Sequence, residues 1–179
     1  MSQANMIQAS DIACRIEEWQ NRTLADLIGY IVAKHHTYLR EALPAVENLL
    51  LPASNDTALM STFRRFRREM EEHMKKEEAI LFPMIEKLER ARETGSAPPK
   101  LPFGSIGHPI AVMEEEHERA RKELAEIRAV TGDYTRVPSG AGTQTSALDK
   151  LKALDADLEI HSRLEDEVLF PRAIGLERA

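Results

Sequence analysis

Two stretches of the chain present the same pair of metal-binding side chains. Residues 73–83 read HMKKEEAILFP and residues 161–171 read HSRLEDEVLFP, so both fit the pattern HxxxExxx[IV]LFP. On a helix, positions i and i+4 lie on one face, about 6 Å apart. Each copy therefore directs the imidazole of its first residue and the carboxylate of its fifth residue at a common point. Convergent ligands of this kind hold metal ions.

Four histidines, one in each of four apolar patterns, belong to the predicted site. Two belong to the motifs, and two lie on apolar stripes elsewhere. A single histidine on an apolar stripe is more often an ordinary core residue than a ligand. Burying the two motif glutamates without a cation, however, would cost several kcal/mol each. The predicted metal ligands are His36, His73, Glu77, His117, His161 and Glu165.

Two further histidines are left out of this set. His35 is next to His36 but about 100° around the helix, so it is expected off the buried stripe. His108 precedes Pro109 near the start of a predicted helix, where an ordinary role in the loop explains it.

The donor types indicate which metals fit. Four neutral imidazoles and two carboxylates suit iron or manganese better than magnesium or calcium, and they are too many for one ordinary zinc ion. If both glutamates bridge and each metal takes two imidazoles, a bridging oxide or hydroxide gives each ion about five ligands and a vacant position. Such a pair binds a small diatomic molecule and exchanges electrons with it. The expected cofactor is a pair of non-haem iron ions, oxo- or hydroxo-bridged, with manganese as the alternative.

The elements that must position these side chains are four amphipathic helices. Apolar residues recur at spacings of three and four in four segments, and no segment alternates with a period of two. The chain therefore predicts an all-α, up-down-up-down four-helix bundle. The helices are expected from Thr23 to about residue 50, from about 56 to 92, from about Ser105 to 131, and from about 145 to between Pro171 and Gly175.

Prolines and polar residues modify this pattern. Pro44 is expected to bend or break the first helix and Pro83 to kink the second, because proline removes a backbone donor. In the second helix, Ile80 is placed on the buried stripe and Glu78 on the outward face.

Length and composition limit the organisation and the partners. A chain of 179 residues suits one domain, predicted as residues 23–179 behind an N-terminal arm or linker of residues 1–22. The net charge of −6 argues against nucleic acid, and the basic stretch at 64–68 is interpreted as a solvated helix face, with partner docking as the alternative. Cys14 is the only cysteine, residues 1–10 show no cationic start followed by an apolar run, and no eighteen consecutive residues are apolar. A cytoplasmic protein without a membrane partner is expected.

The doubled motif, with single histidines on the first and third helices, resembles the hemerythrin-like HHE cation-binding domain. Within that family it looks most like the di-iron proteins of the repair-of-iron-centres type. Supporting stretches are LI at 27–28 leading to HH at 35–36, REALP at 40–44 and VMEEEHE at 112–118. The resemblance covers roughly residues 24–173. It implies a hemerythrin-like bundle in which the six side chains named above bind non-haem iron and both glutamates bridge.

Two departures from the family bear on function. Oxygen-carrying hemerythrins typically have a further histidine one turn along the third helix and HxxxxD on the fourth, whereas this chain has Arg121 and HxxxE. A more symmetrical, more open iron pair is therefore expected, and reversible oxygen storage is not. Repair-type members often begin with a small domain bearing a cysteine pair, while this chain has only Cys14.

The resemblance implies a non-haem di-iron protein that reacts with nitric oxide or reactive oxygen, in stress response or repair of damaged iron centres. As an enzyme it would be a di-iron oxidoreductase, such as a nitric oxide reductase, supplied by an unidentified electron donor. The alternatives are an oxygen or redox sensor or carrier without turnover, and an iron storage or transfer protein. Glu69, one turn before His73, and Glu116, next to His117, are the candidate catalytic residues for proton handling at the open iron positions, with solvated charge as the alternative. Arg40 and Arg121 either anchor contacts around the ligands or are surface charges.

Overall fold

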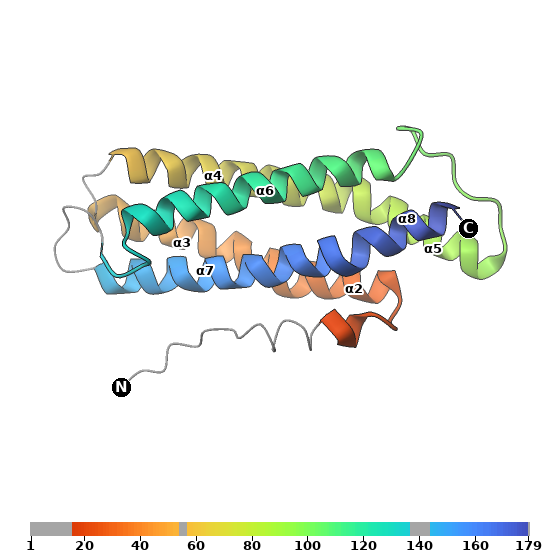
Figure 1. The fold of residues 1–179 in the computed structure, drawn as a ribbon, viewed down its shortest axis with the longest axis horizontal. Helices are drawn as coiled ribbons and strands as arrows, with labels where there is room; N and C mark the ends of the chain where they lie inside the picture. Colours follow the sequence, from red (N-terminus) through yellow and green to blue (C-terminus); the bar gives the residue numbers. More distant parts are fainter. Residues whose placement is uncertain (1–15, 54–56, 137–143, 179) are drawn as a thin grey trace.

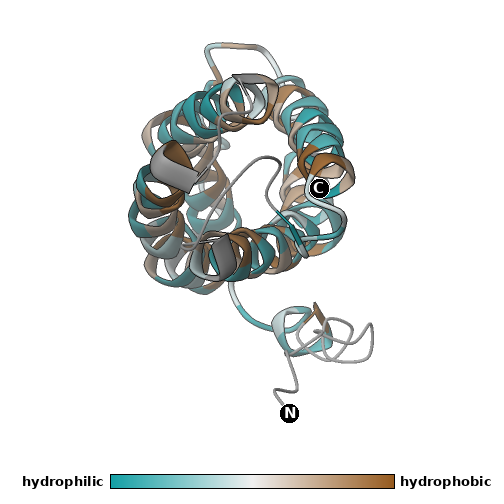
Figure 2. Ribbon diagram, turned by 90° about the vertical axis from the view of Figure 1, so that its left-hand side faces the viewer, coloured by the Kyte–Doolittle hydropathy of each residue, from teal (hydrophilic) through white to brown (hydrophobic). Residues whose placement is uncertain are grey.

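Four helical arms run side by side along the long axis of the molecule. The computed structural model describes residues 16–53, 57–136 and 144–178. Over these residues the chain runs up, down, up and down, and α4 packs on α6 while α3 packs on α7 (Figure 1). Seen end-on, the arms surround a common interior (Figure 2). The predicted all-α, up-down-up-down four-helix bundle is confirmed.

The first, second and fourth arms each consist of two α-helices joined by a short π-helical turn, labelled η. The third arm is a single α-helix. The first arm is α2 (Leu24–Tyr30), η1 (Ile31–His36) and α3 (Thr37–Ala53); the second is α4 (Thr57–Lys76), η2 (Glu77–Leu81) and α5 (Phe82–Thr94); the third is α6 (Gly107–Val130); the fourth is α7 (Gln144–Leu164), η3 (Glu165–Leu169) and α8 (Phe170–Arg178).

The start of α2 is fixed by side chains from two parts of the chain. The Thr23 hydroxyl caps the helix by accepting a hydrogen bond from the backbone N–H of Asp26 at 3.0 Å. The Glu89 carboxylate accepts from the N–H groups of Leu24 and Ala25 at 2.6 and 2.9 Å. A carboxylate is favourable here because helix N-termini carry unpaired N–H groups.

The described part of the N-terminal arm docks on the bundle. Ile16 and Trp19 are buried against the cluster formed by α2, α5 and α8. Arg172 of α8 donates to the carbonyl oxygens of Trp19 and Arg22 at 3.0 and 2.7 Å. Cys14 and the expected start of the second helix, at about residue 56, lie outside the described residues.

The core is divided into two apolar clusters. One contains residues of α3, α4, the end of α6 and α7, and the other contains residues of α2, α5, the start of α6 and α8. The predicted ligand histidines lie at the boundary of the two clusters, such as His36 between Ile31 and Leu39 and His117 between Met113 and Ala120. The fold thus places one polar layer across the middle of the bundle.

The π turns correct the predicted register. The N–H groups of Phe82 and Phe170 donate to the carbonyls of Glu77 and Glu165, five residues back, so each turn contains one extra residue. Ile80, expected on the buried stripe, is therefore rotated outward and is 47% exposed, while Leu81 takes the inward position.

The prolines interrupt the helices less than predicted. Helix α3 continues through Pro44 to Ala53, so the predicted break is wrong. Pro83 follows η2, and Pro171 follows η3, where the wide turn makes room for the ring. The last helix, expected to stop by Gly175, continues to Arg178. Among the described helices, none is long and apolar enough to cross a membrane.

Candidate metal centre

All six predicted ligand side chains lie together in the polar layer. Each is at most 2% exposed. Three of the histidines lie on α-helices, and the fourth lies on η1. The two glutamates are the first residues of η2 and η3. In chain order they are His36 (η1), His73 (α4), Glu77 (η2), His117 (α6), His161 (α7) and Glu165 (η3).

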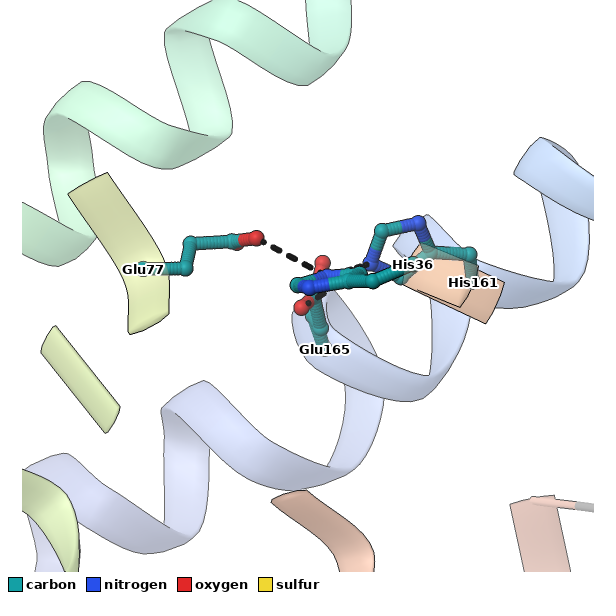
Figure 3. A group of neighbouring side chains, drawn as sticks. All are labelled: His36, Glu77, His161 and Glu165. Carbon is teal, nitrogen blue, oxygen red and sulfur yellow. Dashed lines mark hydrogen bonds and ion pairs between the residues drawn. The ribbon is translucent and has the colours of Figure 1, made fainter. Parts of the chain in front are cut away.

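The side chains form two groups that share both glutamates. His36 and His161 make one group with Glu77 and Glu165, and Figure 3 shows these four side chains pointing toward one another. His73 and His117 make the other group with the same carboxylates. Within each group the ligand atoms lie within 4.8 Å of one another. The Nε2 atoms face each other at 3.2 Å in the first group and at 3.1 Å in the second.

Each carboxylate spans the two groups with its two oxygens. Glu77 places Oε2 3.3 Å from His36 Nε2 and Oε1 3.1 Å from His73 Nε2. Glu165 places Oε1 3.2 Å and Oε2 3.1 Å from the Nε2 atoms of the remaining two histidines. Both side chains are thus arranged as bridges.

The geometry fits a pair of cations. None of the four oxygens of Glu77 and Glu165 accepts a hydrogen bond of acceptable geometry from the described residues, although all four are buried. Buried carboxylates without donors are costly unless a cation compensates them. Ligands bound at about 2.1 Å stand about 3 Å from their neighbours around the same ion, and the observed separations of 3.1–3.3 Å are close to that value. The donor set and its spacing therefore suit a pair of metal ions.

Three of the histidines are held from outside by a carboxylate at Nδ1. His36 meets Glu78 at 2.5 Å, and His117 meets Asp166 at 2.8 Å. His73 meets Glu116 at 3.0 Å. Such contacts fix the ring and the tautomer of a metal-binding imidazole. The three acids are in turn paired with cations: Glu78 with Arg40, Glu116 with Lys76, and Asp166 with Arg121.

Two of these acids were missed by the sequence reasoning. Glu78 was placed on the outward face, yet its carboxylate turns back to His36. Asp166 was not singled out at all. The available signal is that each follows a bridging glutamate directly, in the pairs EE at 77–78 and ED at 165–166. Arg40 and Arg121, each 2.5 Å from its acid, anchor these contacts.

The phenylalanines of the doubled motif stack on the histidines of neighbouring arms. Phe82 lies over His36 with ring centroids 5.8 Å apart, and Phe170 lies over His117 at 6.0 Å. Both phenylalanines are buried. The LFP part of the motif therefore helps to seal the metal layer.

His35 was predicted to lie off the buried stripe, and this prediction is wrong. It is fully buried, its Nδ1 lies 3.1 Å from Asp157 Oδ1, and its ring is parallel to that of His161 at 5.6 Å. The η1 turn explains this, because its extra residue brings both His35 and His36 inward. His35 belongs to neither ligand group. His108 lies outside the layer, with Nδ1 2.8 Å from the carbonyl oxygen of Phe103.

The two candidate catalytic acids lie on the outer side of His73. Glu116 pairs with His73 Nδ1, the ring nitrogen that points away from Glu77. The hydrogen bond from His73, together with Lys76, lowers the pKa of Glu116 to about 2. Glu69 lines a cavity of about 250 Å³ that His73 and Glu116 also line. Their catalytic role stays a prediction.

The carboxylates of the centre attract positive charge strongly. Burial lowers the pKa of His73, but Glu77 and Glu116 outweigh burial and raise it to about 10. Burial likewise lowers the pKa of His117, and Asp166 with Glu165 raises it to about 9. Metal ions compete with these protons, because imidazole binds metal in its neutral form.

The comparisons with known proteins agree with this centre. Residues 27–173 match the hemerythrin HHE cation-binding domain. The "Iron-sulfur cluster repair protein YtfE" of Escherichia coli (strain K12 / DH10B) is 31% identical over 172 residues, which cover 90% of this chain and 71% of that protein. The protein of the same name from Salmonella paratyphi B is 33% identical over 169 residues, with the same coverage. The chain belongs to the hemerythrin HHE cation-binding domain family.

Proposed function

We propose that this chain is a non-haem di-iron protein that reacts with nitric oxide or reactive oxygen and serves the repair of damaged iron centres. The observation that carries the proposal is the pair of buried glutamates, Glu77 and Glu165, each of which faces one histidine of both groups. The relatives named as iron-sulfur cluster repair proteins support the biological setting.

Iron is the proposed metal because the mixed imidazole and carboxylate set suits it, with manganese as the alternative. When bound, iron supplies electron transfer and an open coordination position for a small oxidant such as nitric oxide or oxygen. The electron donor is proposed to be a separate partner.

The side chains around the ligands hold the centre rigid. Glu78, Glu116 and Asp166 fix the rings of their histidines, and their cationic partners keep these acids ionised. The lowered pKa of Glu116 fits this holding role. We assign proton handling to Glu69, because it lines the cavity that reaches His73.

Arg121 supports reaction over reversible oxygen carriage. Arg121 stands one turn after His117, where the oxygen carriers have their further histidine, and its guanidinium donates to Asp166 at 2.5 Å and to Ser162 at 3.3 Å. The centre therefore has two histidines for each metal position. This leaves each ion with room for a small ligand.

Two experiments test the proposal. The iron-loaded protein, reduced without oxygen, is mixed with nitric oxide in the presence of an excess of an artificial electron donor, and separately with oxygen. Release of nitrous oxide over many turnovers is expected, and a stable, reversible oxygen complex would favour a carrier instead. The protein is also added to an iron–sulfur enzyme inactivated by nitric oxide. Recovery of that enzyme's activity is expected with iron-loaded protein and not with metal-free protein. Purification with zinc, or with one metal per chain, would overturn the di-iron proposal.

A further inference from the structure

The two histidine pairs of the centre are not supported equally from outside. In the pair His73 and His117, both Nδ1 atoms meet a carboxylate, at 3.0 and 2.8 Å. In the pair His36 and His161, only His36 does. The Nδ1 of His161 is buried and makes no hydrogen bond with any described residue.

The neighbour beside His161 is another histidine. The ring of His35 is stacked on it, with centroids 5.6 Å apart and planes 8° from parallel. His35 turns its own Nδ1 to Asp157 at 3.1 Å, and its buried Nε2 makes no hydrogen bond with the described residues. The carboxylate of Asp157 is therefore taken up by His35 rather than by His161. The other three ligand histidines each meet an acid at Nδ1.

This difference affects metal affinity. A carboxylate at the outer N–H of a ligating imidazole orients the ring and raises its basicity, and loss of such a partner typically costs 10- to 100-fold in metal affinity. Glu77 and Glu165 give one oxygen to each position, so they do not favour either one. The outer carboxylates are the contacts that distinguish the two positions.

We propose that the two metal positions differ in affinity, with the His73/His117 position about 10- to 100-fold tighter than the His36/His161 position. The ion held by His36 and His161 is the one that leaves first. This inference rests on the proposed di-iron centre. It identifies the ion at His36 and His161 as the one available for transfer to a damaged iron centre.

The test has to be made at equilibrium, because the His73/His117 position is also the one that cavities reach, so the rate at which ions enter differs between the two positions. The cavity of about 250 Å³ reaches His73, and a small one of about 20 Å³ is lined by His117. Openings of this kind change how fast an ion exchanges but not how tightly it is held. Stepwise binding constants alone are also insufficient, since two cations that share carboxylates repel each other even at identical positions.

The experiment adds one equivalent of zinc to the metal-free, full-length protein and follows the imidazole nitrogen signals by NMR. Zinc is chosen because it is diamagnetic and binds imidazole. The His73 and His117 signals are expected to move to bound positions while those of His36 and His161 remain unbound. Zinc found first at His36 and His161, or shared equally by the two pairs, would overturn the inference.

Two matched variants are expected to move the zinc in opposite directions. Asp166→Asn removes the acid beside His117 and should shift zinc toward His36 and His161 by about 10- to 100-fold. Glu78→Gln should deepen the wild-type preference by a similar factor. A pair of variants that both leave the distribution unchanged would overturn the inference. If the protein takes up two zinc ions without preference, the two-metal proposal stands and only the difference in affinity is refuted. If it takes up fewer than two, both the two-metal proposal and the difference in affinity are refuted.

Discussion

Glu77→Gln tests the bridging role of a single carboxylate. One oxygen of Glu77 faces His36 and the other faces His73, so the side chain contributes to both metal positions. Glutamine keeps the shape but has no charge and only one oxygen, and its amide nitrogen is not a ligand. We expect the variant to hold at most one iron per chain, weakly.

The size of the effect follows from binding linkage. With free Fe(II) at 100 times its dissociation constant, each occupied site adds about 2.7 kcal/mol to the free energy of unfolding, and two independent sites add about 5 kcal/mol. For a chain of this length, 1 kcal/mol changes the melting temperature by about 2–4 °C. Iron should therefore raise the melting temperature of the wild type by about 10–20 °C. Most of this rise should be absent in Glu77→Gln.

The assay is thermal unfolding followed by circular dichroism without oxygen, with and without Fe(II). The difference between the two curves is compared, so any change in the metal-free fold cancels. Glu93→Gln, which removes one exposed carboxylate on α5, is the control and should behave as the wild type. A Glu77→Gln protein that binds two irons and shows the full iron-dependent rise would refute the bridging account.

The same geometry leads to four further predictions. Adding Fe(II) to metal-free protein at pH 7 should release about two protons per chain, because the pKa values of His73 and His117, about 10 and 9, lie above neutrality. Protonation of the same two histidines also stabilises the metal-free fold; this stabilisation is complete below pH 6.5 and is lost as the pH rises through about 9 to 10. A pH indicator measures the proton release, and melting curves at a series of pH values measure the stability. An iron addition that releases no proton would contradict the raised pKa values. Glu69→Leu should keep two irons but slow nitric oxide turnover, and unchanged turnover would remove the proton-handling role. Phe170→Ala, which empties a buried position over His117, should lower the free energy of unfolding by about 3–5 kcal/mol in urea titrations, and a loss below about 1 kcal/mol would show that the ring does not seal the layer.

Helical periodicity was sufficient to predict the bundle and the meeting of the ligands. The spacing of His73 and Glu77, repeated at His161 and Glu165, places both pairs on buried faces, and those faces converge in one layer. What the spacing leaves open is the pairing across the bundle. The structure answers this by setting His36 opposite His161, which depends on which arms are neighbours.

The π turns explain most of what the sequence reasoning missed. A single extra residue in a turn leaves no mark in a pattern of threes and fours, yet it turns Ile80 outward and His35 inward. The outer acids were missed for a different reason. Glu78 and Asp166 resemble ordinary surface charges, and only the ring that each one meets on another arm reveals their role.

Anomalous X-ray diffraction at the iron absorption edge, on crystals of the iron-loaded protein, tests the central claim most directly. The account predicts two iron peaks per chain, one between His36 and His161 and the other between His73 and His117, with Glu77 and Glu165 within bonding distance of both. One peak, or a peak away from these four histidines, would contradict it.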